Sequence, residues 1–164
     1  MRFESAAPSI VRSVRQRDLL NTWLRLRAST GAAPPIADYH PSRIEDELKD
    51  IVYYVVKPLD GGWQFIIDSH GSRLSHAYGN AGRSSVGMDL RDYVGPRMVD
   101  VVLPMYEECA NRALPTYSIS TVEDTQGRGV AYERLLLPFS NDGSVTRIIA
   151  SLKTISEDGK FEIN

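Results

Sequence analysis

Ala131-Tyr132-Glu133-Arg134-Leu135-Leu136-Leu137-Pro138-Phe139-Ser140-Asn141-Asp142-Gly143 is the stretch from which the fold can be argued. The apolar run Leu135–Leu137 predicts a buried strand, and Pro138 is expected to end its regular pairing. The residues at 141–143 tolerate positive φ and therefore predict a tight turn. Because a second β-rich run follows at residues 145–155, we expect the two strands to form a hairpin.

Length and composition indicate one globular domain. The chain has 164 residues, of which 42% are hydrophobic, and this is enough apolar material for a core. A net charge of −2 gives no bulk attraction to nucleic acid or to an anionic membrane, so neither partner is expected. No apolar run approaches the roughly 20 residues that span a bilayer, and the N-terminus lacks a signal-peptide core. The expected location is therefore the cytoplasm.

The N-terminal part predicts a helix. Residues 1–12 are expected to be a flexible tail, followed by a helix and linker over residues 13–35. Ser13 with Gln16 is a capping-box pattern and Gly31 is a stop signal, so the helix should cover residues 14–28. Its apolar face is too broad for a coiled-coil seam. This face packs on its own domain or also against a second subunit, for which the candidate contacts are Leu20, Trp23 and Leu24.

The rest of the chain predicts two groups of strands separated by helices. Strands rich in β-branched and aromatic residues are expected at 51–56, 63–67, 116–122, 130–137 and 145–153. Short helices are expected within 38–50, 71–79 and 90–94. A longer helix should have Pro96 at its first position and be closed by Pro115. This order predicts an α+β fold in which one five-stranded antiparallel sheet carries helices on one face, in addition to the N-terminal helix.

The order of elements resembles that of a PAS domain, and the sequence resembles the PAS_5 family, whose single-domain or N-terminal modules occur mainly in alphaproteobacteria. The resemblance covers about residues 18–155. It rests on Leu19-Leu20 with Trp23 and Arg27, Asp38-Tyr39-His40-Pro41 with Ile44 and Leu48, Gly71 with Tyr78-Gly79, Pro115, and residues 133–140 with Asp142-Gly143. It implies a PAS domain over residues 36–155, a C-terminal tail over 156–164, and a role in bacterial signal transduction.

No motif supports a covalent flavin or a haem, so the cofactor stays unknown. A covalent flavin photosensor of this fold needs a cysteine in an Asn-Cys-Arg segment, whereas Cys109 follows two glutamates and is expected to be a buried structural thiol. As the single cysteine, it also excludes an intrachain disulfide. Haem needs an axial ligand such as histidine. His40 and His70 are expected in exposed segments, and His76, on a helix that should flank the pocket, is expected to be a surface residue; the three lack metal-ligand spacing.

Glu133 and Arg134 are adjacent on a strand and therefore point to opposite faces of the sheet. Glu133 shares its face with Leu135, and Arg134 shares the other face with Tyr132 and Leu136. Both faces thus carry apolar side chains, unlike a sheet with one solvated face. We therefore expect both faces to be covered, the outer one by the N-terminal helix or by a second subunit.

Six residues are candidates for lining a ligand pocket: His76, Tyr78, Tyr106, Tyr117, Tyr132 and Arg134. The commoner role for such tyrosines is to fill a core, with their hydroxyls reaching its edge. Arg134 is compatible with an anion-binding role or with a structural ion pair. A structural ion pair is the commoner role for a buried arginine, and the ligand pocket stays the sharper hypothesis.

Three functional hypotheses follow. The favoured one is a PAS sensory or interaction module that binds a small molecule or a protein, forms a homodimer and passes its signal to a separate partner, because 164 residues leave no room for a kinase or cyclase domain. The alternative is a ligandless dimerisation and docking scaffold. The third is a small α+β enzyme with His76 or Glu133 as base. No catalytic arrangement can be argued from spacing, so an enzyme is not expected.

Overall fold

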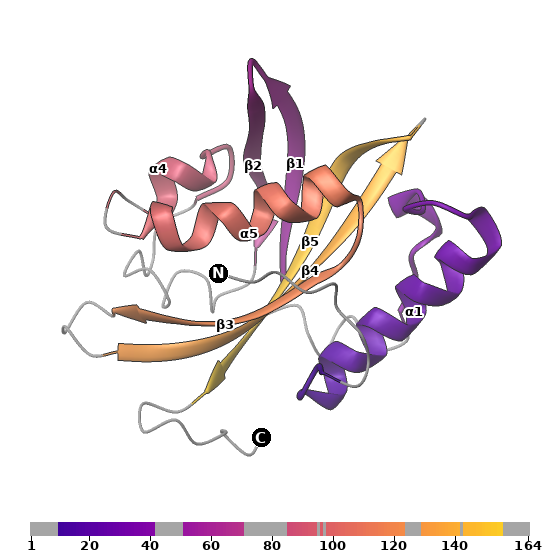
Figure 1. Ribbon diagram of the computed structural model, residues 1–164, viewed down its shortest axis with the longest axis horizontal. Coiled ribbons are helices and arrows are strands. Elements are labelled where there is room, and N and C mark those ends of the chain that lie inside the picture. Colours follow the sequence, from indigo (N-terminus) through magenta and orange to yellow (C-terminus); the bar gives the residue numbers. More distant parts are fainter. Residues whose placement is uncertain are drawn as a thin grey trace.

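One antiparallel sheet of five strands separates two layers of helices (Figure 1). This computed structural model describes residues 10–41, 51–70, 85–94, 96, 98–123, 129–141 and 143–155. The strands run in the spatial order β2-β1-β5-β4-β3, which confirms the expected sheet. Their bounds are β1 Ile51–Leu59, β2 Gly62–His70, β3 Thr116–Glu123, β4 Gly129–Asn141 and β5 Ser144–Ile155.

Helix α1 (Val14–Thr30) has the Ser13 cap and the Gly31 stop that the sequence indicated. The Ser13 hydroxyl accepts a hydrogen bond from the Gln16 N–H at 3.3 Å, which satisfies one orphan donor of the first turn. Gly31 adopts a left-handed φ of 75° and its N–H donates to the Arg27 carbonyl at 2.7 Å. The helix is two residues longer than expected.

The other described helices are α4 (Leu90–Val94), as expected, α5 (Val99–Arg112) and a 3₁₀ turn at Ile36–Asp38. The expectation that Pro96 occupies the first position of α5 is wrong. The first hydrogen bonds of α5 go to the Met98 carbonyl, so Pro96 lies in the turn before the helix. The helix ends where Ala113 adopts a left-handed conformation, two residues before Pro115. The helix expected within 71–79, and residues 42–50 of the earlier one, lie outside the described part of the chain.

The expectation that Pro138 ends the pairing of β4 is also wrong. Strand β4 continues to Asn141, and Pro138 lies opposite Ile148 of β5. Strand β3, however, pairs with β4 only as far as Leu136. Beyond that point the side of β4 that faces away from β5 has no strand of this sheet beside it, and a residue without an N–H is tolerated there.

Helix α1 and the loop that follows it cover this free side of β4. The Trp23 indole Nε1 donates to the Pro138 carbonyl at 2.7 Å. The Ser140 N–H donates to the Pro34 carbonyl at 3.0 Å, and the Ser140 hydroxyl donates to the Ala33 carbonyl. Backbone groups of β4 that would otherwise be buried without partners are therefore satisfied by the N-terminal segment.

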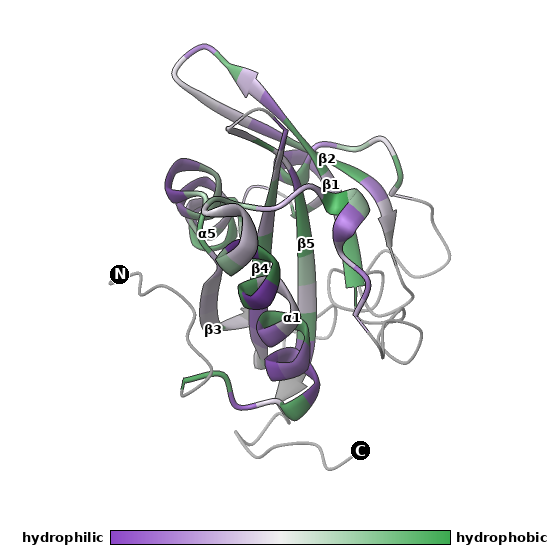
Figure 2. Cartoon of the chain, turned by 90° about the vertical axis from the view of Figure 1, so that its right-hand side faces the viewer, coloured by the Kyte–Doolittle hydropathy of each residue, from purple (hydrophilic) through white to green (hydrophobic). Residues whose placement is uncertain are grey.

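Each face of the sheet has its own hydrophobic core, as the alternation of side chains requires. The α5 face, which packs against α4 and α5, buries Tyr54, Phe65, Leu136 and Ile148 among others. The α1 face, which packs against α1, buries Ile51, Leu135, Leu137, Phe139 and Ile149. Figure 2 shows hydrophobic residues along β5 and both hydrophobic and hydrophilic residues on α1. The prediction that both faces are covered is confirmed, and α1 of the same chain covers the outer one.

Trp23→Phe should lower the free energy of unfolding by about 1–3 kcal/mol, because a ring of similar shape leaves the buried Pro138 carbonyl without its donor. Urea unfolding followed by circular dichroism measures the change. The matched control is Trp63→Phe, whose indole N–H donates to Asn111 Oδ1 at an exposed position and whose loss should amount to less than about 1 kcal/mol. Equal effects of the two substitutions would contradict this account of the β4 edge.

Candidate functional site

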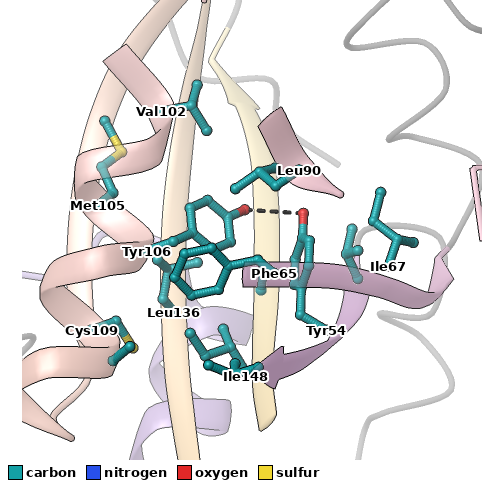
Figure 3. Packing of buried hydrophobic residues seen from close by; sticks show 14 of the residues in the cluster. Tyr54, Phe65, Ile67, Leu90, Val102, Met105, Tyr106, Cys109, Leu136 and Ile148 are labelled. Carbon is teal, nitrogen blue, oxygen red and sulfur yellow. Dashed lines mark hydrogen bonds between the residues drawn. The ribbon is translucent and has the colours of Figure 1, made fainter. Parts of the chain in front are cut away.

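The α5 face of the sheet has an aromatic centre built from β1, β2 and α5. Tyr54, Phe65 and Tyr106 are buried there, with ring centroids 5.1 Å apart for the two tyrosines and 5.6 Å apart for Phe65 and Tyr106. The two tyrosine hydroxyls lie 3.3 Å apart and share a hydrogen bond, drawn as a dashed line in Figure 3. Aromatic rings therefore fill this part of the interior, and their polar ends are paired with each other.

Arg134 lies on the same face, between β3 and α5. Its side chain is 1% exposed. One terminal nitrogen, Nη1, donates to the Ser120 hydroxyl at 3.1 Å and lies 3.4 Å from the Met105 sulfur, which also accepts a hydrogen bond from the Ser118 hydroxyl at 3.0 Å. A guanidinium remains charged in proteins and can bind carboxylate or phosphate in a planar pair. The α5 face thus contains a buried cationic group that contacts a hydroxyl and a thioether.

Three of the candidate ligand residues, Tyr106, Tyr132 and Arg134, are buried on the α5 face. Tyr106 belongs to the aromatic centre, and Tyr132 lies two residues before Arg134 on β4. His76 and Tyr78 lie outside the described residues. The structure therefore places half of the set that the sequence indicated on one face of the sheet.

Tyr117 does not belong to this group, because it lies on the α1 face. Its hydroxyl donates to the Glu133 carboxylate, which is buried on that face. Burial, and then the hydrogen bond and charge of Glu133, raise the pKa of Tyr117 above its ordinary value. From α1, Gln16 Nε2 donates to the carbonyls of Ser151 at 3.1 Å and Glu133 at 3.4 Å. Glu133 and Tyr117 thus form part of a polar contact between α1 and the sheet, away from the α5 face.

The candidate contacts for a second subunit lie against the chain's own sheet. Leu20 and Trp23 are fully buried in the core of the α1 face, and Leu24 is half-buried beside them. These three side chains stabilise the single chain, which is the simpler of the two alternatives that the helix pattern allowed. Apolar side chains that remain exposed include Val14 at the start of α1 and Ile119 on β3, which by alternation shares the face of Tyr117.

Sequence reasoning missed Met105, Ser118 and Ser120, which contact Arg134 or each other. The two serines alternate along β3, and they stand opposite Arg134 and Tyr132 in the ladder. The two serines alternate with Tyr117 and Ile119 along the sequence, and this alternation already indicated that the serines lie on the opposite face of the sheet. The pairing partner of β3, however, follows only from the sheet register, which the sequence did not determine.

The described residues offer no metal site. No group of three or more histidine, cysteine or acidic side chains among them could hold a metal ion. Cys109 is buried, and its burial raises the pKa of the thiol. His40 is exposed. Within the same residues, no helix is both long and apolar enough to cross a membrane.

Comparison with known proteins identifies the class of fold. No family model and no curated protein matches the sequence. The chain is similar to the solved structure of a light-oxygen-voltage domain from work on a flavin analogue, with a TM-score of 0.52 and 15% identity over 70% of this chain and 83% of that one. The fold is therefore of the PAS type. Membership of the PAS_5 family stays a prediction.

Two further solved structures show a weaker similarity. The light-state structure of the light-oxygen-voltage domain of the photoreceptor Aureochrome1 gives a TM-score of 0.48 at 14% identity, over 73% of this chain and 91% of that one. An RNA-binding light-oxygen-voltage receptor gives 0.49 at 17% identity, over 76% of this chain and 34% of that one. Light sensing and RNA binding are properties of those proteins.

Stability should fall with rising pH from about pH 8.5, the ordinary pKa of a thiol, because Cys109 keeps its proton in the folded chain while the unfolded chain loses it. The expected slope is up to about 1.4 kcal/mol per pH unit. Cys109→Ala should flatten this dependence between about pH 8.5 and 9.5, where tyrosines with the ordinary pKa of about 10 are still mostly protonated. Urea unfolding at a series of pH values measures it; identical slopes for both proteins would show that the thiol does not contribute.

Proposed function

We propose that this chain is a PAS sensory module that binds a small anionic molecule on the α5 face and passes the signal to a separate protein partner. The observation that supports it is the position of Arg134. Its guanidinium is buried on the face that packs against α5, next to hydroxyl groups of β3 and on the same face as Tyr106 and Tyr132. A carboxylate or phosphate would form short, charge-assisted hydrogen bonds with this group.

The signal would travel through β4. This strand carries Arg134 on the α5 face and Glu133 with Leu135 on the α1 face, and Gln16 of α1 is hydrogen-bonded to the Glu133 carbonyl. A shift of β4 on ligand binding therefore changes contacts made by α1. Packed cores switch between discrete arrangements, so a small displacement in one layer is passed to the next.

Native mass spectrometry of the purified chain tests the ligand. The wild-type protein should retain a small molecule, and Arg134→Gln should lose it or bind it at least tenfold more weakly, because the charged fork is removed. The matched control is Glu133→Gln, an adjacent substitution on the same strand whose side chain lies on the opposite face. This variant should retain the molecule.

Circular dichroism shows whether Arg134→Gln folds, and Arg134→Lys provides a second variant that keeps the charge but loses the planar fork. Weakened retention in both Arg134 variants, with Glu133→Gln unchanged, is the expected result. Equal retention in folded Arg134→Gln and wild type would overturn the assignment of Arg134 to the ligand.

A ligandless docking scaffold is the second candidate function, and the aromatic centre favours it. Tyr54, Phe65 and Tyr106 already fill part of the space between the sheet and α5, with their hydroxyls paired. Such a module would act by forming a homodimer and docking a signalling protein. A bare mass and a spectrum without a visible band would favour this function, and light scattering at high concentration would then measure the dimer.

A further inference from the structure

A hollow of about 230 Å³ lies where the C-terminal ends of two helices meet the turn between β4 and β5. It is separate from the α5 face. Its lining combines two arginines with small side chains: Arg27, Ala32, Ala33, Arg112, Ala113, Leu114, Ser140 and Gly143. Among the described residues that line it, two carry a formal positive charge and none is acidic. An electropositive hollow with a small-residue surface allows an anion to approach closely.

The two arginines reach the hollow from elements that pack on opposite faces of the sheet. Arg27 belongs to the last turn of α1, and its side chain makes no hydrogen bond or ion pair with any residue in the described ranges. Arg112 belongs to the last turn of α5 and pairs with Glu108 at 3.4 Å, with the two side chains 39% and 30% exposed. Exposed pairs of this kind contribute little, so Arg112 can exchange its partner.

The helix dipole explains each arginine singly but not their convergence. A basic side chain is stabilised near the C-terminal end of any helix. The dipole does not require two such side chains from different helices to line one hollow. Arg112 is paired there with Glu108, and a phosphate would give both guanidinium groups a shared partner. Planar guanidinium groups bind phosphate oxygens in pairs.

We propose that this hollow binds a small phosphate-bearing ligand between Arg27 and Arg112. Its volume lies below the roughly 300–1,000 Å³ of pockets for drug-sized ligands, so it accommodates a phosphate with at most a small organic group. Bound there, the ligand joins the end of α1 to the end of α5. It also abuts Ser140 and Ala33, where the loop after α1 is hydrogen-bonded to β4.

Nuclear magnetic resonance titration tests the site with two probes, inorganic phosphate and glycerol phosphate, against sodium chloride at equal ionic strength. The expected result is a saturable shift of backbone amides that line the hollow, among them Ala33, Leu114 and Gly143. Tighter binding of glycerol phosphate would identify a phosphate monoester as the ligand, and equal binding would identify the free anion.

The substitutions Arg27→Gln and Arg112→Gln should each weaken binding at least tenfold, and the double variant should show no saturation. The matched control is Arg25→Gln on the same helix, where the exposed arginine donates to Thr22 and does not line the hollow. It should bind as wild type does. Shifts no larger than those with sodium chloride, or saturable binding that survives in the double variant, would overturn the proposal.

Discussion

The structure depends on how the backbone groups on the free side of β4 find hydrogen-bond partners. Strand β4 runs five residues past its last pairing with β3, at Leu136. Along residues 137–141 its free side therefore has no β3 residue beside it. A buried carbonyl or N–H without a partner destabilises a fold by an amount comparable to a lost hydrogen bond. Trp23 and the Ala33–Pro34 segment supply those partners. Helix α1 is therefore part of the fold and not an appendage to it.

This arrangement also makes β4 the element shared by both layers. Its alternating side chains place Leu135 and Leu137 under α1 and Arg134 with Leu136 under α5. The N-terminal helix and the candidate ligand face are separated by one strand. The hollow lined by Arg27 and Arg112 adds a second place where the two layers meet, at the ends of their helices.

Local signals predicted the local structure. Ser13, Gln16 and Gly31 marked the ends of α1, and the turn at Gly143 with its flanking runs predicted the last hairpin. The errors had non-local causes. A proline ends the pairing of a strand where a neighbouring strand needs its N–H. Strand β3 does not reach Pro138, and this follows from the sheet register, which is not a local property of the sequence. Proline is common at the first position of a helix, which is why Pro96 was expected there, but α5 begins three residues later, at Val99.

The candidate site was predicted in part, for a similar reason. The sequence established that Glu133 and Arg134 lie on opposite faces, but both faces are apolar, so it did not determine which face carries which residue. Tyr117 was grouped with Arg134 although the register places it with Glu133. The contacts of Arg134 with Ser120 and Met105 join residues 14 and 29 positions apart, and only the folded chain reveals them.

Native-state hydrogen exchange tests most directly the claim that α1 and β4 form one cooperative unit. Amides in the middle of α1 and the Ser140 N–H, which is bonded to Pro34, should open with the same free energy as amides in the centre of β5. That result would show that the N-terminal helix separates from the sheet only when the whole chain unfolds. Exchange of α1 and Ser140 at a much lower free energy than β5 would contradict the account, since the helix would then be a layer that detaches by itself.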